Sequence, residues 1–457
     1  MVSLFETIVI ELQKCYYILD RLIPKGTSVS RRINTTAQWF FDGFENPIHP
    51  QHAKKENVPG KHLVPTHDRF HAYHLRCSWS RRSNCRHDSQ VVWQKVSTIS
   101  PAKQLTISII VPAFNEAAGI ADTLTSLLSQ TRKADRIIVV NDCSTDTTEE
   151  IALTFADRGV EVLTPPHNLG SKAKAQNYAL ESISDTDLVL PIDGDTVLEP
   201  TYIEKLVPVF SDPLVSVAAG CVLTQRQETI WEKARQLEYL FGFHWYRTIQ
   251  QMASSPTVCS GCCTVFRRHW IVEAGGFPET TLTEDIFYTW GQYIEGRKAV
   301  YVHDAVARAA EPISLKYMST QLKRWKCGWF HGFRLQWPKL VRHKPMVALW
   351  SGLQFLETTL APIVMLLPLL AVLLFGIPVW QTFAWWLLGD LITFWPPVIY
   401  GCIKRGYPIR KALLSYHTWY ALKLVNFRWD VHMLVREMIL VPLGICKPWT
   451  TYERGKA

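Results

Sequence analysis

The sequence predicts an α/β protein with a mostly parallel sheet, followed by amphipathic helices and a C-terminal helical membrane region. Three observations predict this fold class. Apolar runs of strand length alternate with helical segments between residues 105 and 200. Residues 226–252 carry apolar side chains at every third or fourth position. After residue 338 the chain becomes apolar over stretches about as long as a bilayer core requires.

Composition limits the class of protein. A chain of 457 residues is long enough for two or three structural units. The net charge of +9 suits an anionic partner, which leaves a nucleotide substrate, anionic lipid and nucleic acid open. The 11 cysteines are scattered and odd in number, which favours a reducing compartment over a disulfide scaffold. The N-terminus has no pattern of a secretory signal, so none is expected.

Residues 1–104 form the first predicted region. Apolar residues at helical spacing predict a helix from Met1 to about Pro24, either packed on the protein or lying on a membrane. The stretch that follows to residue 104 is polar, basic and rich in histidine, which predicts a partly ordered linker. Its histidines and cysteines match no zinc spacing. Its basic residues suit lipid headgroups or nucleic acid.

Four runs of strand length predict the first strands, at Thr106–Pro112, which is rich in β-branched residues, Arg136–Val140, Val160–Leu163 and Leu188–Ile192. Helices are expected between them at 118–129 and 147–155, and in the segment that carries Lys174 and Asn177. A polar cluster follows each strand. Because the carboxyl ends of parallel strands meet at one edge of a sheet, these clusters are expected to lie together.

The fourth cluster is Asp193-Gly194-Asp195, at the end of a strand. Carboxylate oxygens suit Mg²⁺ or Mn²⁺, and a cation held in this way usually also carries substrate phosphates. The alternative is a plain turn, because Asp and Gly are common turn residues. The three residues alone leave both interpretations open.

Two further motifs lie beyond residue 280. Thr283-Glu284-Asp285 precedes a predicted helix, where acidic residues suit the first turn. Gln321, Arg324 and Trp325 have the spacing of one helix face. An arginine fork suits a diphosphate and a tryptophan ring suits stacking on a sugar or base, whereas the alternative is an amphipathic helix with a cation–π pair. The helix at 226–252 is a core helix or a membrane-interface helix, and its aromatic residues favour the interface.

In this order the motifs resemble the family 2 glycosyltransferases, in particular the processive synthases of hyaluronan, chitin, cellulose and poly-N-acetylglucosamine. The resemblance covers Ile107 to about Trp337. It implies a GT-A-type nucleotide-sugar domain over residues 105–338 that uses a UDP-sugar together with Mg²⁺ or Mn²⁺. Cys259, Cys262 and Cys263, in the segment that resembles the acceptor side, are predicted to be buried thiols.

The resemblance also implies roles for single residues. Asp195, with Asp193, would hold the metal, and Asp285 would be the general base with Glu284 as its neighbour. The remaining roles are the uridine pocket (Asn115, Glu116, Asp142), the donor phosphates (Lys172, Lys174) and closure over donor and acceptor (Gln321, Arg324, Trp325).

Residues 339–457 are predicted to form the membrane region and a basic tail. Transmembrane helices are expected near 359–376 and 378–403, with a further apolar segment at 412–446. Basic residues flank the pair on both sides, which predicts cytoplasmic flanks and a cytoplasmic catalytic domain. Asp390 lies in the second helix, where an acid indicates a polar lining, a helix partner or a misplaced boundary.

The resemblance implies a membrane-bound, inverting transferase that moves a sugar onto a growing β-linked polysaccharide. The short membrane region favours the alternative, transfer of one or a few sugars to a lipid or protein acceptor. A catalytically dead membrane binding protein is opposed by the intact Asp193, Asp195, Asp285 and Arg324. The expected partners are a UDP-sugar, a carbohydrate acceptor and membrane lipids. Nucleic acid is not expected, and homo-oligomerisation and the identity of the sugar are left open.

Overall fold

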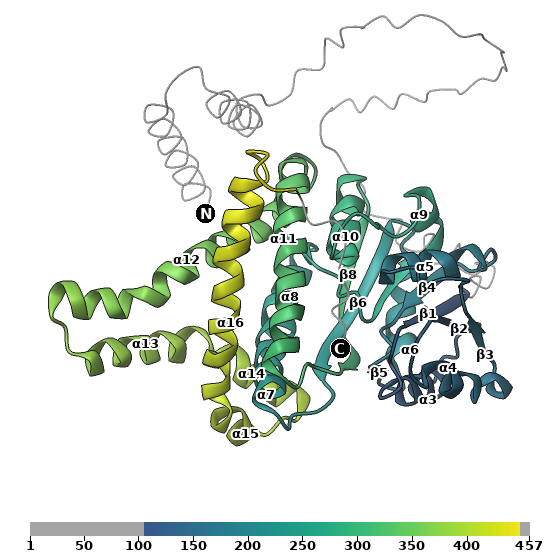
Figure 1. Ribbon diagram of the computed structural model, residues 1–457, viewed down its shortest axis with the longest axis horizontal. Helices are drawn as coiled ribbons and strands as arrows, with labels where there is room; N and C mark the ends of the chain where they lie inside the picture. Colours follow the sequence, from purple (N-terminus) through teal and green to yellow (C-terminus); the bar gives the residue numbers. More distant parts are fainter. Residues whose placement is uncertain (1–104, 448–457) are drawn as a thin grey trace, which may run out of the picture. The chain divides into compact units, whose positions relative to one another are not determined.

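An eight-stranded sheet forms the core of residues 105–447, the part of the chain that the computed structural model describes (Figure 1). The predicted N-terminal helix, the linker to residue 104 and the end of the tail lie outside the described residues. The strands are ordered β3-β2-β1-β4-β7-β6-β8-β5. Their bounds are Ile107–Ala113 (β1), Arg136–Asn141 (β2), Val160–Leu163 (β3), Leu188–Pro191 (β4), Thr196–Leu198 (β5), Val215–Thr224 (β6), Thr264–Arg267 (β7) and Lys298–Ala309 (β8).

The first four strands are parallel, as predicted. They are connected by helices α3 (Ile120–Leu128), α4 (Thr148–Leu153) and α5 (Lys172–Glu181). Alternate residues of β1 point to opposite faces of the sheet. Ile107, Ile109 and Val111 therefore pack in the same core cluster as α3, whereas Ile110 packs in the cluster that contains α5. Figure 1 shows α5 on one face of these strands and α3 and α4 on the other.

The second half of the sheet is mixed, so the predicted mostly parallel sheet is correct only for the first four strands. β7 runs antiparallel to β4 and β6, and β5 runs antiparallel to β8. Only β6 and β8 form a further parallel pair. β5 follows β4 after only a short turn, but it pairs with β8 at the edge of the sheet and not with β4. The regular alternation of strands and helices, which predicted the parallel order, ends at this turn.

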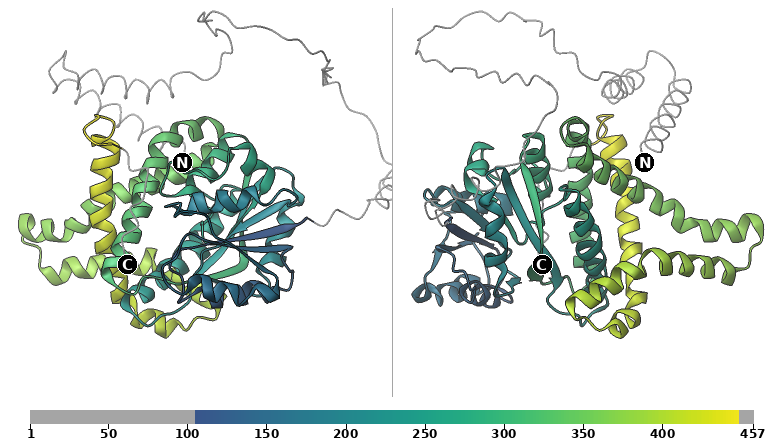
Figure 2. Two further views of the ribbon diagram at one scale, coloured as in Figure 1. Left: turned by 45° about the vertical axis from the view of Figure 1, so that its right-hand side comes forward. Right: turned by 180° about the vertical axis from the view of Figure 1, so that it is seen from behind.

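Helix α11 (Leu315–His343) is the central helix beside the sheet, and it packs against α10 (Glu284–Ile294), α12 (Pro345–Phe375) and α16 (Tyr416–Val435). Figure 2 shows α11 and α16 side by side from two directions. The other helices are α6 (Tyr202–Leu206), α7 (Ile230–Phe241), α8 (Arg247–Met252), α9 (Arg268–Glu273), α13 (Val379–Thr393), α14 (Trp395–Arg405) and α15 (Ile409–Leu414).

Gly328 allows α11 to approach the start of α10. A Cβ at Gly328 would lie 2.3 Å from Thr283 Oγ1 and 2.5 Å from its Cγ2, which the branched threonine side chain cannot relieve by bending away. We expect Gly328→Ala to lower the free energy of unfolding by roughly 1–3 kcal/mol, the usual range for an overpacked core. Gly332→Ala is the matched control, because its Cβ would meet its nearest neighbour at 3.9 Å. Denaturant melts of the detergent-solubilised Gly328→Ala and Gly332→Ala variants measure the loss of stability. Equal unfolding midpoints for the two variants would contradict the prediction.

Helix α7 is a core helix, so the predicted position at a membrane interface is wrong for residues 230–241. It begins at Thr229, whose side chain accepts a hydrogen bond from the Glu232 N–H at 3.2 Å. α7 packs against β6, α14 and α16, and Trp231 and Tyr239 are buried. Leu237 and Leu240 pack in the core cluster of the sheet, whereas Trp231 and Ala234 pack against α11 and α16, so protein covers the apolar side chains that were expected to meet lipid.

Within residues 105–447, no single helix has the length and apolar composition needed to cross a membrane. The predicted span at 359–376 lies within α12. The predicted span at 378–403 is divided into α13 and α14, which meet the criteria of length and composition only as a pair bent by 43°. Pro396 and Pro397 in the first turn of α14 explain the break, because they lack the N–H groups that would continue α13.

Asp390 of α13 has a helix partner, one of the alternatives that the sequence left open. Its Oδ2 accepts hydrogen bonds from the hydroxyls of Tyr416 at 2.7 Å and Tyr420 at 2.8 Å, and Lys423 Nζ lies 3.5 Å from its Oδ1. All three partners belong to α16. The acid therefore joins two helices of the C-terminal region.

Candidate active site

The turns that follow β1, β2 and β4 lie together at one edge of the sheet, as predicted, because β1 pairs with both other strands. The Asp142 N–H donates to the Ala113 carbonyl at 2.8 Å, which joins the first two turns. Asn115 has a φ of +60°, and its Oδ1 accepts from the Thr145 N–H at 2.8 Å. Asparagine tolerates this left-handed backbone better than most residues. The Asn115 side chain therefore holds the turn after β2 against the turn after β1.

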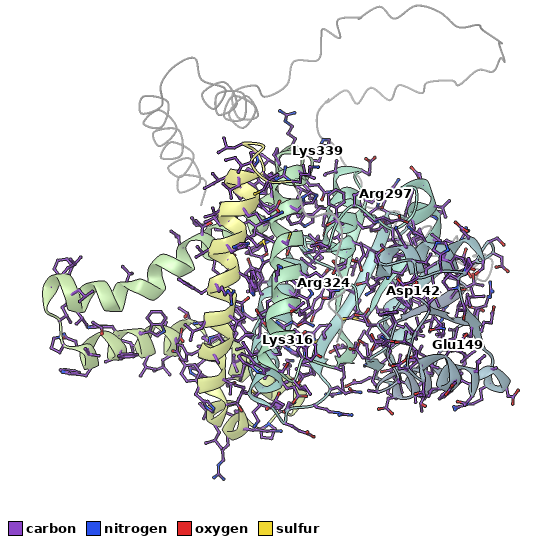
Figure 3. The ribbon with its side chains drawn as sticks, in the orientation of Figure 1. Asp142, Glu149, Arg297, Lys316, Arg324 and Lys339 are labelled. Atoms are coloured by element: carbon purple, nitrogen blue, oxygen red, sulfur yellow. The ribbon has the colours of Figure 1, made fainter. Side chains whose placement is uncertain are left out.

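Asp142 is buried at this edge (Figure 3). Its Oδ1 accepts the Leu169 N–H at 2.6 Å, and its carbonyl accepts from Asn168 Nδ2 at 2.7 Å. These bonds bring the segment after β3 to the same edge. The predicted gathering of four polar clusters is thus complete.

The Asp193-Gly194-Asp195 turn packs against the start of α3. A Cβ at Gly194 would lie 3.0 Å from Glu116 Cγ, so glycine is what lets the turn approach that side chain. The Asp195 carbonyl accepts the Ala310 N–H at 3.2 Å, which ties the turn to the end of β8. Burial, then the charges of Asp193 and Glu311, raise the pKa of Asp195 to about 7.

Lys172 brings the distant acidic motifs together. It is the first residue of α5, and its Nζ forms an ion pair with Asp193 Oδ1 and lies 3.8 Å from Glu284 Oε1. Burial opposes its charge, but the carboxylates of Asp193 and Glu284 outweigh burial and hold the pKa of Lys172 above its ordinary value. Lys174, two residues further along α5, is exposed.

Asp285 is held by a backbone N–H from another segment. The Gly261 N–H donates to Asp285 Oδ2 at 2.8 Å, and the Gly261 carbonyl accepts from Lys172 Nζ at 2.9 Å. A Cβ at Gly261 would lie 3.3 Å from Asp285 Cβ, which is a tight approach. Burial, followed by the charge of Glu284, raises the pKa of Asp285 to about 6. A carboxyl with this pKa can exchange protons near neutral pH.

Gln321, Arg324 and Trp325 lie half-buried on α11, and Figure 3 labels Arg324 there. The predicted helical spacing is therefore confirmed. The guanidinium of Arg235, from α7, lies over the Trp325 ring at 4.4 Å from Cζ to the ring centroid. The alternative interpretation of this motif predicted a cation–π pair. Trp325 does form such a pair, but with Arg235 of α7 and not with a cation of its own helix.

Comparison with known proteins adds to this geometry. Residues 108–274 match glycosyl transferase family 2. This region is a family 2 glycosyltransferase domain. The match includes the turns that carry Asn115, Asp142 and Asp193, and it ends before Asp285.

The chain that carries this glycosyltransferase domain is similar to two polysaccharide synthases. It is 25% identical over 223 residues to poly-beta-1,6-N-acetyl-D-glucosamine synthase of Staphylococcus aureus (strain COL). The aligned region covers 49% of this chain and 54% of that protein. It is 28% identical over 262 residues to hyaluronan synthase of Streptococcus pyogenes, over 54% of this chain and 62% of that protein. The chain thus spans little more than half the length of these relatives. The predicted resemblance to processive synthases is confirmed.

A solved structure agrees with the glycosyltransferase fold. The mannosyltransferase from Pyrobaculum calidifontis, in complex with GDP-Man and Mn²⁺, aligns with a TM-score of 0.51 at 18% identity. The alignment covers 74% of this chain and 88% of that chain. At this identity the likeness establishes the α/β fold alone.

The carboxylates of the glycosyltransferase domain fit a divalent cation. Among residues 105–447 no group of three or more His, Cys, Asp or Glu side chains is arranged to hold a metal. Mg²⁺, however, is commonly bound by one or two carboxylates together with substrate phosphates. The raised pKa of Asp195, caused by burial and by two nearby acids, is the condition that a cation between Asp193 and Asp195 would relieve.

Sequence reasoning placed Gly261 only in the segment that resembles the acceptor side, without a role of its own, and it missed Arg235 and Glu311. Glu311 follows β8 and is buried, with Oε2 3.1 Å from Arg235 Nε. Neither Arg235 nor Glu311 belongs to a motif that could be read from spacing, and Arg235 lies in the helix that was expected at a membrane interface. Only the folded arrangement, in which Arg235 of α7 meets Trp325 of α11 and Glu311 after β8, identifies these two residues.

Proposed function

We propose that this chain is a membrane-bound, inverting glycosyltransferase that moves a sugar from a UDP-sugar to a growing β-linked polysaccharide. One observation carries the proposal. Lys172 pairs with Asp193 on one side and, through the Gly261 backbone, reaches Asp285 on the other. A metal–diphosphate site and a basic carboxylate are thereby supported at the same sheet edge. The named activities of the two similar synthases support the same reaction class.

The donor would lie along the sheet edge. Asn115, Glu116 and Asp142 line the end where the uracil is proposed to bind. Lys172 and Lys174, in the first turn of α5, are proposed to lie near the diphosphate. Asp193 and Asp195 would hold Mg²⁺ or Mn²⁺, which when bound offsets the charge that develops on the leaving diphosphate.

Asp285 is proposed as the general base. It accepts the proton of the acceptor hydroxyl while that oxygen attacks the anomeric carbon on the side opposite UDP. The bond to the UDP oxygen breaks, UDP leaves, and the product is β-linked. Glu284 raises the basicity of Asp285, since its charge is a cause of the raised pKa. Gln321, Arg324 and Trp325 are proposed to close over donor and acceptor.

The proposed base predicts a pH profile. Asp285 acts only when it is ionised, so kcat/KM should fall about tenfold per pH unit below its pKa of about 6 and level off above it. The measurement is UDP release at saturating Mn²⁺ between pH 4.5 and 8. A plateau that extends below pH 5 would contradict this assignment, since an ordinary carboxyl would then be titrating.

The predicted domain division at residue 338 and the integral membrane location belong to the proposal. The bent pair of α13 and α14 and the basic residues that flank it, such as Lys404 and Arg405, support a membrane region with cytoplasmic flanks. The glycosyltransferase domain would then face the cytoplasm.

A second candidate is transfer of one or a few sugars to a lipid or protein acceptor. It is favoured by the finding that only a bent helix pair within residues 105–447 meets the criteria for a span. The deciding experiment is UDP release by the detergent-purified full chain with Mn²⁺ or Mg²⁺ over a panel of UDP-sugars, with products sized on a gel. High-mass, glycosidase-sensitive product supports the polymer, small products support the second candidate, and no release from any donor refutes both.

A further inference from the structure

Arg235 lies inside the protein in the middle of α7, where its side chain is 1% exposed. Its Nε lies 3.1 Å from Glu311 Oε2, and its Nη2 donates to the Tyr239 hydroxyl at 3.1 Å. Its Nη1 pairs with Glu238. Each end of the guanidinium is therefore bonded. Such a buried ion is stable only with satisfied donors, so this network has a defined geometry.

The same guanidinium lies over the rings of Trp325 and Tyr239. The distance from Arg235 Cζ to the indole centroid is 4.4 Å. Arginine can stack on a ring with its face while its edge donates to carboxylates, because the guanidinium is planar. A sugar that stacks on Trp325 must therefore use the opposite face of the ring.

The network also reaches the turn that carries Asp195. Glu311 follows Ala310, whose N–H donates to the Asp195 carbonyl at 3.2 Å. Arg235 thus connects Trp325 on α11 with the strand end that supports the proposed metal site. No other buried arginine described in residues 105–447 makes both a carboxylate pair and a stack on a residue of the candidate site.

We propose that Arg235 is a positioning residue that fixes the Trp325 ring for the acceptor sugar. This inference rests on the proposed function. The guanidinium of Arg235 is bonded to protein groups, so Arg235 would act through the ring. A displaced ring moves the acceptor hydroxyl away from Asp285 and slows transfer. Hydrolysis of the donor by water needs no aligned acceptor, so it should be unaffected.

The test is Arg235→Lys in the full chain. Lysine keeps a positive charge for Glu311, but an ammonium group cannot stack on Trp325 and bond both acids at once. We expect UDP affinity and donor hydrolysis to be unchanged, whereas transfer to acceptor falls about tenfold. In a Trp325→Leu background, Arg235→Lys should have no further effect, because the two residues act as one unit. Arg136→Lys, in the surface pair with Glu161, is the matched control.

Three results would overturn the proposal: additive effects of the two substitutions, an equal loss of hydrolysis and transfer, or an unchanged rate of transfer. If Arg235→Lys does not fold, Arg235→Met with Glu311→Gln removes both buried charges together, and transfer must then fall further than hydrolysis.

Failure of the proposed function can be told apart from failure of this inference. If the wild-type chain transfers no sugar from any UDP-sugar, the contact between Arg235 and Trp325 is still tested by ¹⁹F NMR of protein labelled with 5-fluorotryptophan. The Trp325 resonance, assigned from its loss in Trp325→Phe, should shift in Arg235→Lys and remain in place in Arg136→Lys. An unshifted resonance means that Arg235 does not position the ring.

Discussion

Asp285→Asn is expected to lower sugar transfer by about 10²–10⁴-fold, the contribution typical of a positioned general base. The substitution keeps the size of the side chain, and its amide oxygen can still accept the Gly261 N–H, which lies 2.8 Å from Asp285 Oδ2, although the bond from the Ile286 N–H to Oδ1 is lost. It also removes the repulsion between Asp285 and Glu284 that contributes to the raised pKa of Asp285. The fold should therefore be retained while the proton acceptor is lost.

Measurement of UDP affinity by calorimetry, beside UDP release, separates catalysis from binding. Asp285→Asn should bind UDP as the wild type does, because the donor is proposed to lie against Lys172 and the turns after β1, β2 and β4. Glu273→Gln is the control acid-to-amide change, since Glu273 is an exposed partner of Arg297. A rate within tenfold of the wild type would exclude Asp285 as the base.

The local pattern of the sequence was sufficient to predict the first four strands and their parallel order. The runs at Arg136–Val140 and Leu188–Ile192 are short, largely apolar and followed by polar turn residues, which predicted buried strands, and their polar ends lie together as parallel strands require. The mixed second half was beyond this reasoning, because a three-residue strand such as β5 carries no periodicity of its own. Its pairing with β8 is decided by tertiary contacts.

The candidate site was predictable as a set of motifs but not as a set of contacts. An amphipathic helix has the same pattern whether lipid or protein covers its second face, so α7 was placed at an interface and Arg235 was overlooked. Likewise, no spacing rule relates Lys172 to Glu284, which come from different helices. Long-range electrostatic pairs of this kind depend on the folded arrangement.

Asp195→Asn is expected to affect activity and stability in opposite directions. With metal present, UDP release should fall by about 10²–10³-fold, because a catalytic cation supplies several kcal/mol of charge stabilisation and loses one of its two proposed protein ligands. Without metal, the variant should be more stable than the wild type at pH 8. The folded protein must keep an ionised carboxylate beside Asp193 and Glu311, which burial and these charges disfavour.

The direction of this change in stability follows from the pKa of Asp195 in the folded protein. Asp195 has a folded-state pKa of about 7 against an ordinary value of 3.8, so as pH rises the unfolded chain releases this proton first. Wild-type stability is therefore lost as pH rises from about 4 to 7, and the Asn variant should lack that loss. Asp212→Asn gives the opposite expectation, because the hydrogen bond from Lys298 holds the pKa of Asp212 below its ordinary value. Denaturant melts in EDTA between pH 4 and 8 test the expected pH dependence of stability for both variants, Asp195→Asn and Asp212→Asn. A destabilised Asp195→Asn at pH 8 would mean that this carboxylate supports the fold and is not retained for a cation.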